Sequence, residues 1–335
     1  MKKSHGSGIS PWRRLINMLH PERAHINYIF VYALLTGLIS LSIPLGITAV
    51  FNLLLNGAMY SSTYILIAVV IVGVVIGGLM TIGQLTIVEA IEQKIFTRAS
   101  VEFAYRLPRI KKKELEGEYP PELVNRFFDI LTIQKGLTKL LVDIVASGVS
   151  MVFSVILLAF YHPIFIVMGV LTILGIGGII LLYFRRGVDT SIEESAYKYE
   201  LVAYLERVAG NLDHHRVPAA MNDVIKQTDK INARYLRARN SHFRILRKFF
   251  ASSVVLRTIL MGGLLLMGSW FVVERQMTLG QFVAAEVIIV QIGYAVEKLL
   301  TSLDTIFDMV TGSEKLAAVT DLEIEETTNI NHASL

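Results

Sequence analysis

The sequence predicts an all-α membrane protein with six transmembrane helices and long helical extensions on one side of the membrane. The chain of 335 residues is 53% hydrophobic and 18% charged, whereas soluble globular chains average about 45–50% apolar and about 25% charged. It also contains uncharged stretches of roughly 20 residues or more, the length that a helix needs to cross a bilayer. The apolar content excludes a disordered chain. Because the sequence has no cysteine, a disulfide scaffold and thiolate chemistry are also excluded.

The predicted spans follow from five apolar stretches, one of which holds two spans. These stretches are residues 28–55, 64–88, 144–184, 249–273 and 278–303. The stretch 144–184 is too long for one span, and Tyr161-His162-Pro163 inside it predicts a tight turn between the third and fourth spans. The extreme N-terminus has no apolar region typical of a cleavable signal peptide, so we expect none.

The basic residues predict which side of the membrane each loop faces. Of the 32 Lys and Arg residues, 28 lie in the N-terminus, the loops 89–137 and 185–248, and the segment after residue 302. The connections on the opposite side of the spans, residues 56–63, 161–162 and 274–277, contain one Lys or Arg residue in total. Because cytoplasmic loops carry an excess of Lys and Arg, we expect both termini and both long loops in the cytoplasm, and the protein in the cell membrane. The net charge of +4 is then explained by the basic cytoplasmic loops of a membrane protein. Because aromatic residues are not interleaved with the basic ones, this charge does not predict nucleic-acid binding.

A short amphipathic helix is predicted before the first span. Ser10 is a suitable N-cap and Pro11 a suitable first helical residue. One face of this helix carries Trp12, Leu15, Ile16 and Leu19. We expect the cytoplasmic N-terminus, residues 1–27, to lay this helix on the membrane surface; the alternative is an ordinary cytoplasmic helix.

The two long loops have the pattern of helical hairpins. In the first loop, arms at 89–107 and 122–137 flank a tip rich in proline, and in the second, arms at 193–209 and 222–248 flank the segment 210–221. An arm of about 26 residues reaches roughly 40 Å at 1.5 Å per residue. Two rigid arms could transmit motion to a partner docked on their tips; alternatively they are only cytoplasmic bulk.

Ionisable residues within the spans are candidates for function, because charge inside a membrane is costly. In the sixth span, Glu286, Gly293, Glu297 and Asp304 fall on one helical face. We expect this stripe to line a translocation pathway and the glutamates to meet cationic or polar parts of the cargo. The alternative is a structural role, in which Glu286 pairs with Arg257 or Arg275 and Glu297 pairs with a basic group such as Lys298. Arg257 in the fifth span is the natural ion-pair partner of one of these glutamates.

The order of these elements resembles the transmembrane domain of exporter-type ABC transporters. The segment 121–129, PELVNRFFD, is similar to the family's Gly-Glu-Leu…Arg…Asp pattern before the third span, with Pro in place of Gly. The segment 277–284, MTLGQFVA, is similar to the start of the family's sixth span, and Pro44 matches a proline found midway in many first spans. The resemblance covers roughly residues 12–320 and implies a six-span ABC exporter-type domain at 28–303, followed by a cytoplasmic extension at 304–335.

The resemblance also implies how the chain is driven. In most such exporters an ATPase domain follows the sixth span, but the sequence has neither G-x-x-x-x-G-K-[ST] nor Leu-Ser-Gly-Gly. We therefore expect a permease subunit that is not itself an enzyme and binds no cofactor, works as a homodimer or heterodimer, and uses ATP and Mg²⁺ bound by a partner ABC ATPase subunit. The tip residues implied to contact that subunit are Pro108, Arg109, Ile110, Lys111, Asn211, Leu212, Asp213, His214 and His215.

Three alternatives remain at this stage. A stand-alone carrier would be expected to show inverted repeats and broken helices near the midplane, and no repeat is visible. A membrane scaffold and a truncated half-transporter are the others. For the neighbouring His214 and His215, a contact with a partner is favoured over a metal site, because adjacent helical residues point 100° apart and no second cluster of ligands accompanies them.

Overall fold

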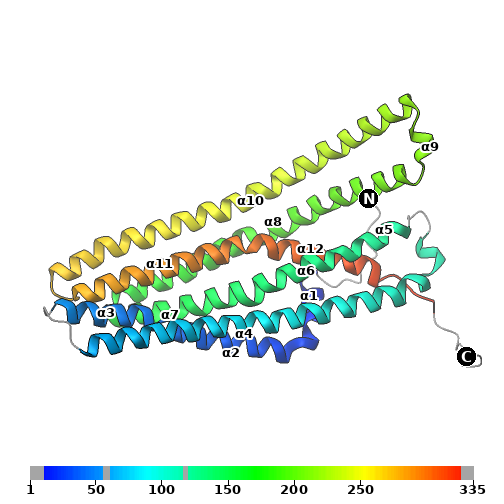
Figure 1. Ribbon diagram of the computed structural model, residues 1–335. Helices are drawn as coiled ribbons and strands as arrows, with labels where there is room; N and C mark the ends of the chain where they lie inside the picture. Colours follow the sequence, from blue (N-terminus) through cyan, green and yellow to red (C-terminus); the bar gives the residue numbers. More distant parts are fainter. Residues whose placement is uncertain (1–10, 56–60, 116–119, 326–335) are drawn as a thin grey trace, which may run out of the picture.

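The computed structural model describes residues 11–55, 61–115 and 120–325, and all regular secondary structure in these ranges is helical. Within these ranges, six helical segments are long and apolar enough to cross a membrane, as the sequence predicts. They pack side by side as an elongated bundle (Figure 1). The main helices are α1 (Pro11–Leu19), α2 (Arg23–Ser40), α3 (Ser42–Leu55), α4 (Ser61–Arg106), α5 (Pro120–Asn125), α6 (Asp129–Thr138), α7 (Val145–Tyr161), α8 (Ile164–Ala209), α9 (Leu212–His215), α10 (Pro218–Val273), α11 (Leu279–Thr301) and α12 (Leu303–Thr320).

Three helices run without interruption from the membrane-crossing part of the bundle into the hairpins. Helices α4 and α8 have 46 residues each and α10 has 56, so the predicted arms are continuations of the spans. The turn predicted between the third and fourth spans is confirmed, because α7 ends at Tyr161 and α8 begins at Ile164. We call the end of the bundle that carries the two tips the hairpin end. There the α8–α10 arm diverges from α4 and α6 (Figure 1).

The first and third spans are not uniform α-helices. The first is broken at Leu41, between α2 and α3. Pro44 explains the break, because its ring crowds the carbonyl four residues earlier, at Ser40, where α2 ends. In the third span a π-helical turn, Lys139–Ile144, separates α6 from α7. Such turns are often found at functional sites.

The segment after residue 303, expected from the sequence to be an extension beyond the sixth span, begins with a packed helix. The chain bends at Ser302, and α12 continues to Thr320 with most of its apolar side chains buried. Phe307 is fully buried against Phe184 and Phe249, which belong to α8 and α10. The helical pattern of apolar residues in the sixth span thus continues past residue 303, where the sequence predicts the span to end. It does so because α12 fills the centre of the hairpin end.

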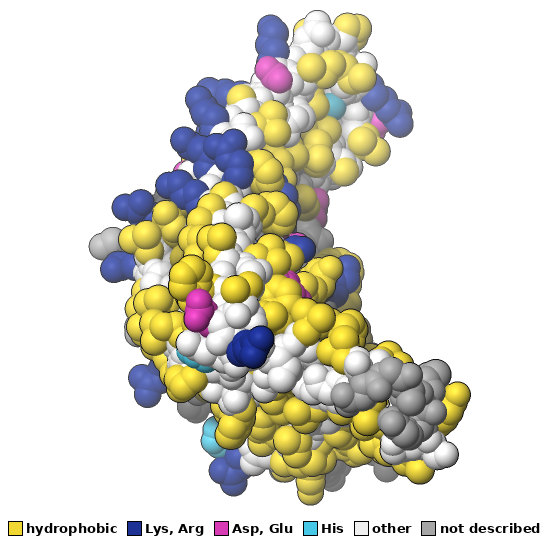
Figure 2. Space-filling view, turned by 90° about the vertical axis from the view of Figure 1, so that its left-hand side faces the viewer, with side chains coloured by type: hydrophobic (Ala, Val, Ile, Leu, Met, Phe, Trp, Pro, Cys, Tyr) yellow, Lys and Arg dark blue, Asp and Glu magenta, His cyan; other side chains and the backbone are white. Residues whose placement is uncertain are grey.

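The surface of the bundle matches an apolar solvent. Large apolar side chains are exposed on the membrane-crossing segments, among them Leu181 (85%), Phe160 (79%) and Leu266 (78%). Figure 2 views the molecule from the end opposite the tips, and apolar side chains cover much of this end. In the upper part of the same view, Lys and Arg side chains gather along one edge of the molecule. Exposed apolar surface of this extent is unfavourable in water and favourable in lipid.

The predicted amphipathic helix is present as α1. Leu15 is buried, and the Trp12 ring meets the edge of Phe184 at a centroid distance of 6.2 Å. Arg14 forms an ion pair with Asp321 at 2.6 Å. The helix is therefore fastened to α12 and α8, and its position on the membrane surface stays a prediction.

Candidate functional site

The acidic stripe of the sixth span faces α10. Arg257 of α10 donates to Glu297 of α11 at 3.1 Å, so the ion pair predicted from the sequence is confirmed. Gly293 makes room for this arginine, because a Cβ there would lie 3.1 Å from Arg257 Cγ. The guanidinium also lies 5.1 Å from the centre of the Tyr294 ring. The charge of Glu297 is thus balanced within the chain.

A second charged cluster lies one residue further along α11. Lys298 contacts Asp143 at 2.9 Å, and Asp143 also contacts Lys139 at 3.0 Å. The pair of Lys139 and Asp143 is the one expected from their spacing of four residues. The sequence did not indicate that the π-helical turn would present Asp143 to Lys298, and it offered Lys298 to Glu297 instead. This cluster joins the third span to the sixth.

Glu286 differs from the other acidic residues of the stripe. Its Oε1 is buried and has no hydrogen-bond partner among residues 11–55, 61–115 and 120–325. The residue lies seven positions after Leu279, or about 10 Å along the helix from the end opposite the tips. Arg257, one of the two partners considered from the sequence, is engaged by Glu297 instead. Glu286 therefore remains the candidate for contact with cargo, and its role stays a prediction.

The stripe continues past the bend into a polar contact at the hairpin end. Asp304 lies 3.3 Å from Nε2 of His242, which is 1% exposed, and Nδ1 of this histidine lies 2.9 Å from the Thr190 hydroxyl. The three residues connect α12, α10 and α8. This contact fixes the base of the α8–α10 arm.

Two further contacts hold the arms together, and the sequence analysis missed both. The Tyr199 hydroxyl donates to the carboxylate of Asp129, which is 8% exposed, and the Asn125 amide donates to Glu206. Each contact joins α8 to the first hairpin. Residues 70 or more positions apart leave no local spacing from which to predict them.

The second tip is largely exposed. Helix α9 carries Leu212, Asp213, His214 and His215, and Asn211 precedes it. The two imidazole rings lie 5.0 Å apart at 78°, consistent with side chains that point in different directions. A hollow of about 450 Å³ beside them is lined by residues of α8, α9 and α10. These side chains are accessible, and their contact with a partner stays a prediction.

The first tip is partly covered by the chain itself. Pro108 and Arg109 lie in a 3₁₀ turn, Leu107–Arg109, and Pro108 is exposed. Ile110 is only 6% exposed, and Lys111 contacts Glu323 at 2.8 Å. Of the four residues implied to contact a partner, Ile110 is therefore enclosed within this chain, which corrects its assignment as a contact residue.

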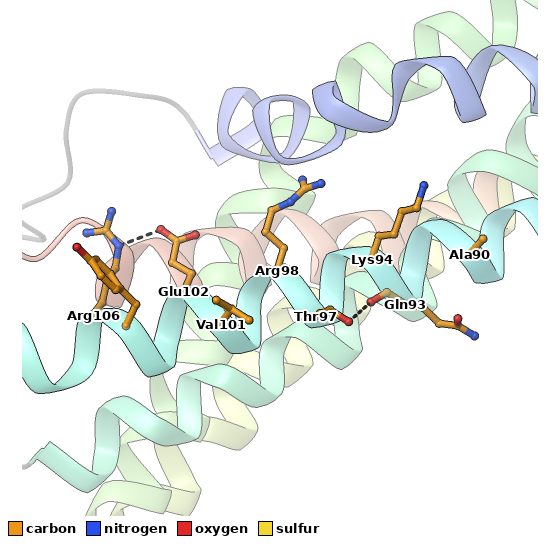
Figure 3. Close-up of a pocket in the computed structure, with 9 residues that line it drawn as sticks. Ala90, Gln93, Lys94, Thr97, Arg98, Val101, Glu102 and Arg106 are labelled. Atoms are coloured by element: carbon orange, nitrogen blue, oxygen red, sulfur yellow. Dashed lines mark hydrogen bonds and ion pairs between the residues drawn. The ribbon is translucent and has the colours of Figure 1, made fainter. Parts of the chain in front are cut away.

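A groove of about 940 Å³ lies along α4 beside the N-terminal helices. Arg98 and Lys94 point from it toward the N-terminal helices, whereas Gln93 points to the other side of α4 (Figure 3). There the buried Glu22 accepts from Arg98 at 2.9 Å and from Lys94 at 3.4 Å. The basic side chains that line the groove are therefore already paired. The contacts of Arg98 and Lys94 with Glu22 join α4 to the junction of α1 and α2.

A comparison with protein families agrees with this architecture. The family model of the ABC transporter transmembrane region matches residues 26–296. The match begins in α2 and ends in α11, so it includes both hairpins and reaches into every membrane-crossing segment. No match was found among curated proteins. Because the matched region makes up most of the chain, this multi-pass membrane protein belongs to the family of ABC transporter transmembrane components.

Proposed function

We propose that the chain is the membrane-spanning permease subunit of an ATP-driven exporter, powered by an ABC ATPase on another polypeptide. The observation that carries this proposal is the pair of long hairpins whose tips lie at one end of a six-helix bundle of this family. Three of the four arms, those formed by α4, α8 and α10, are single helices from the tip into the span, so a displacement of a tip is carried into the spans. The resemblance assigns ATP and Mg²⁺ to the partner, and the chain itself is not an enzyme.

In this proposal the hairpin end faces the cytoplasm of a cell membrane, because nearly all Lys and Arg residues lie on that side of the spans. Two copies of the chain, or this chain and a related one, enclose one pathway. ATP binding to the partner favours one of two packings of the helices, and the pathway opens alternately to each side. The contacts at His242 and Asp129 are positioned to hold the arms in one such packing.

The cargo contact in this proposal is Glu286. Glu297 is neutralised by Arg257, and Asp143 is neutralised by two lysines. A carboxylate oxygen inside a span that has no partner in the described part of the chain suits a cargo that carries a cation or a hydrogen-bond donor.

The division of labour is tested with the purified full-length chain in lipid nanodiscs. The proposal predicts no magnesium-dependent ATP turnover by the chain alone and turnover once the partner ATPase is added. A clear turnover by the chain alone, retained after rigorous removal of contaminating ATPases, would contradict it.

A further inference from the structure

The segment that follows α12 pairs with the tip of the first hairpin. Ile110 and Ile324 form an isolated antiparallel bridge. The Lys111 amide donates to the Glu323 carbonyl at 3.0 Å, and the Glu325 amide donates to the Arg109 carbonyl at 2.7 Å. Two reciprocal hydrogen bonds of this kind fix the register of both segments. We call residues 321–325 the strap.

The strap is also held by side chains. Ile110 is buried in the same apolar cluster as Val319, and Leu322 packs against that cluster. Glu323 and Lys111 meet at 2.8 Å. This ion pair is exposed and adds little stability, so its role is to help align the two segments. The apolar contacts hold the strap in place.

The other end of the strap is fastened to two helices. It continues directly from α12, which ends at Thr320. Its first residue, Asp321, forms the ion pair with Arg14 of α1. The strap therefore connects the first tip to the sixth span and to the N-terminal helix over a few residues, whereas the path along α4 runs through 46 residues.

From these contacts we infer that residues 321–325 form a coupling strap, which keeps the first tip and α12 together as one moving unit. This inference rests on the proposed function, because it concerns how a partner bound to the tip acts on the sixth span. The strap residues are positioning residues: they hold Pro108 and Arg109 in place for the partner. The strap stays closed while the transporter works.

The absence of cysteine from the sequence makes a direct test possible. In a bridge with this hydrogen-bond pattern the two Cα atoms lie about 4.5 Å apart, within the range that a disulfide spans. The variant Ile110→Cys with Ile324→Cys is therefore expected to cross-link under mild oxidation in membranes. The pair Leu212→Cys with Ile324→Cys, which joins the strap to the other tip, is the matched control and should stay reduced. Failure of the first pair to cross-link would overturn the inference without bearing on the proposed function.

The second part of the test asks what the strap does. Glu325→Pro removes the amide that bonds Arg109, while Glu325→Ala keeps it. With the partner ATPase bound, we expect Glu325→Pro to lower ATP-driven transport at least fivefold and Glu325→Ala to leave it within twofold of the wild type. The oxidised Ile110→Cys, Ile324→Cys transporter should remain active. Equal activity of the two Glu325 variants, or arrest by the disulfide that is relieved by reductant, would overturn the inference. No ATP-driven transport by the wild type would instead contradict the proposed function.

Discussion

Replacing Phe307 by alanine tests whether α12 is an integral part of the bundle. The ring is fully buried and contacts three aromatic rings, those of Phe184, Phe249 and His242. On its remaining side it lies over Gly187, where a Cβ would overlap it. Because a glycine leaves no side chain that could move into the space, we expect a loss in the upper part of the usual range, about 4–5 kcal/mol.

The effect is measured as a shift in the thermal unfolding midpoint of the detergent-solubilised protein. The entropy of unfolding is about 2.1 cal/mol/K per residue, or about 0.7 kcal/mol/K for a chain of 335 residues. Phe307→Ala should therefore lower the midpoint by roughly 6–7 °C. The matched control is Phe250→Ala, which removes a ring that is 51% exposed and should change the midpoint by about 2 °C or less. A shift for Phe307→Ala no larger than that of the control would refute the account of α12 as the centre of the hairpin end.

Three further predictions concern the charged groups. A double-mutant cycle with Arg257→Gln and Glu297→Gln, measured by unfolding, should give a coupling energy of about 1 kcal/mol, since both side chains are more than one-third exposed; additive effects would contradict the ion pair. Glu286→Gln should abolish export while the complex still assembles, and unchanged transport would remove this residue from the pathway. The neighbouring Lys111 lowers the pKa of the Glu323 carboxylate below its ordinary value. The stabilisation from this pair is therefore present above the unfolded-state pKa and is lost as the pH falls through the lower folded-state value. The difference in unfolding midpoint between wild type and Glu323→Gln should disappear in acid, and a difference that grows in acid would contradict this.

The sequence predicts those features that depend on neighbouring residues. Apolar length gives the six spans, and the proline-rich segment before residue 122 and the glycine and proline of 210–221 give the two tips. A spacing of four residues gives the ion pair of Lys139 and Asp143. The sequence limits the partner of Arg257 to Glu286 or Glu297, because few charged residues occur inside the spans and each needs an opposite charge or a polar partner.

Other features depend on which distant segments pack together, and no periodicity reports that. The Tyr199–Asp129 contact and the bridge between Ile110 and Ile324 each join distant parts of the chain. The extent of α12 was missed for a related reason. Its apolar residues are buried by other helices, so the segment lacks the uniform apolar character by which a span is recognised.

The most direct test of the proposed function is affinity purification of the tagged chain from its native membranes, followed by identification and quantification of what co-purifies. The account predicts an ABC ATPase subunit in a ratio near 1:1, lost when residues 211–217 of the second tip are replaced by a Gly-Ser linker. A chain recovered intact, correctly folded and without any nucleotide-binding subunit would contradict the claim that it is the permease of an ATP-driven exporter.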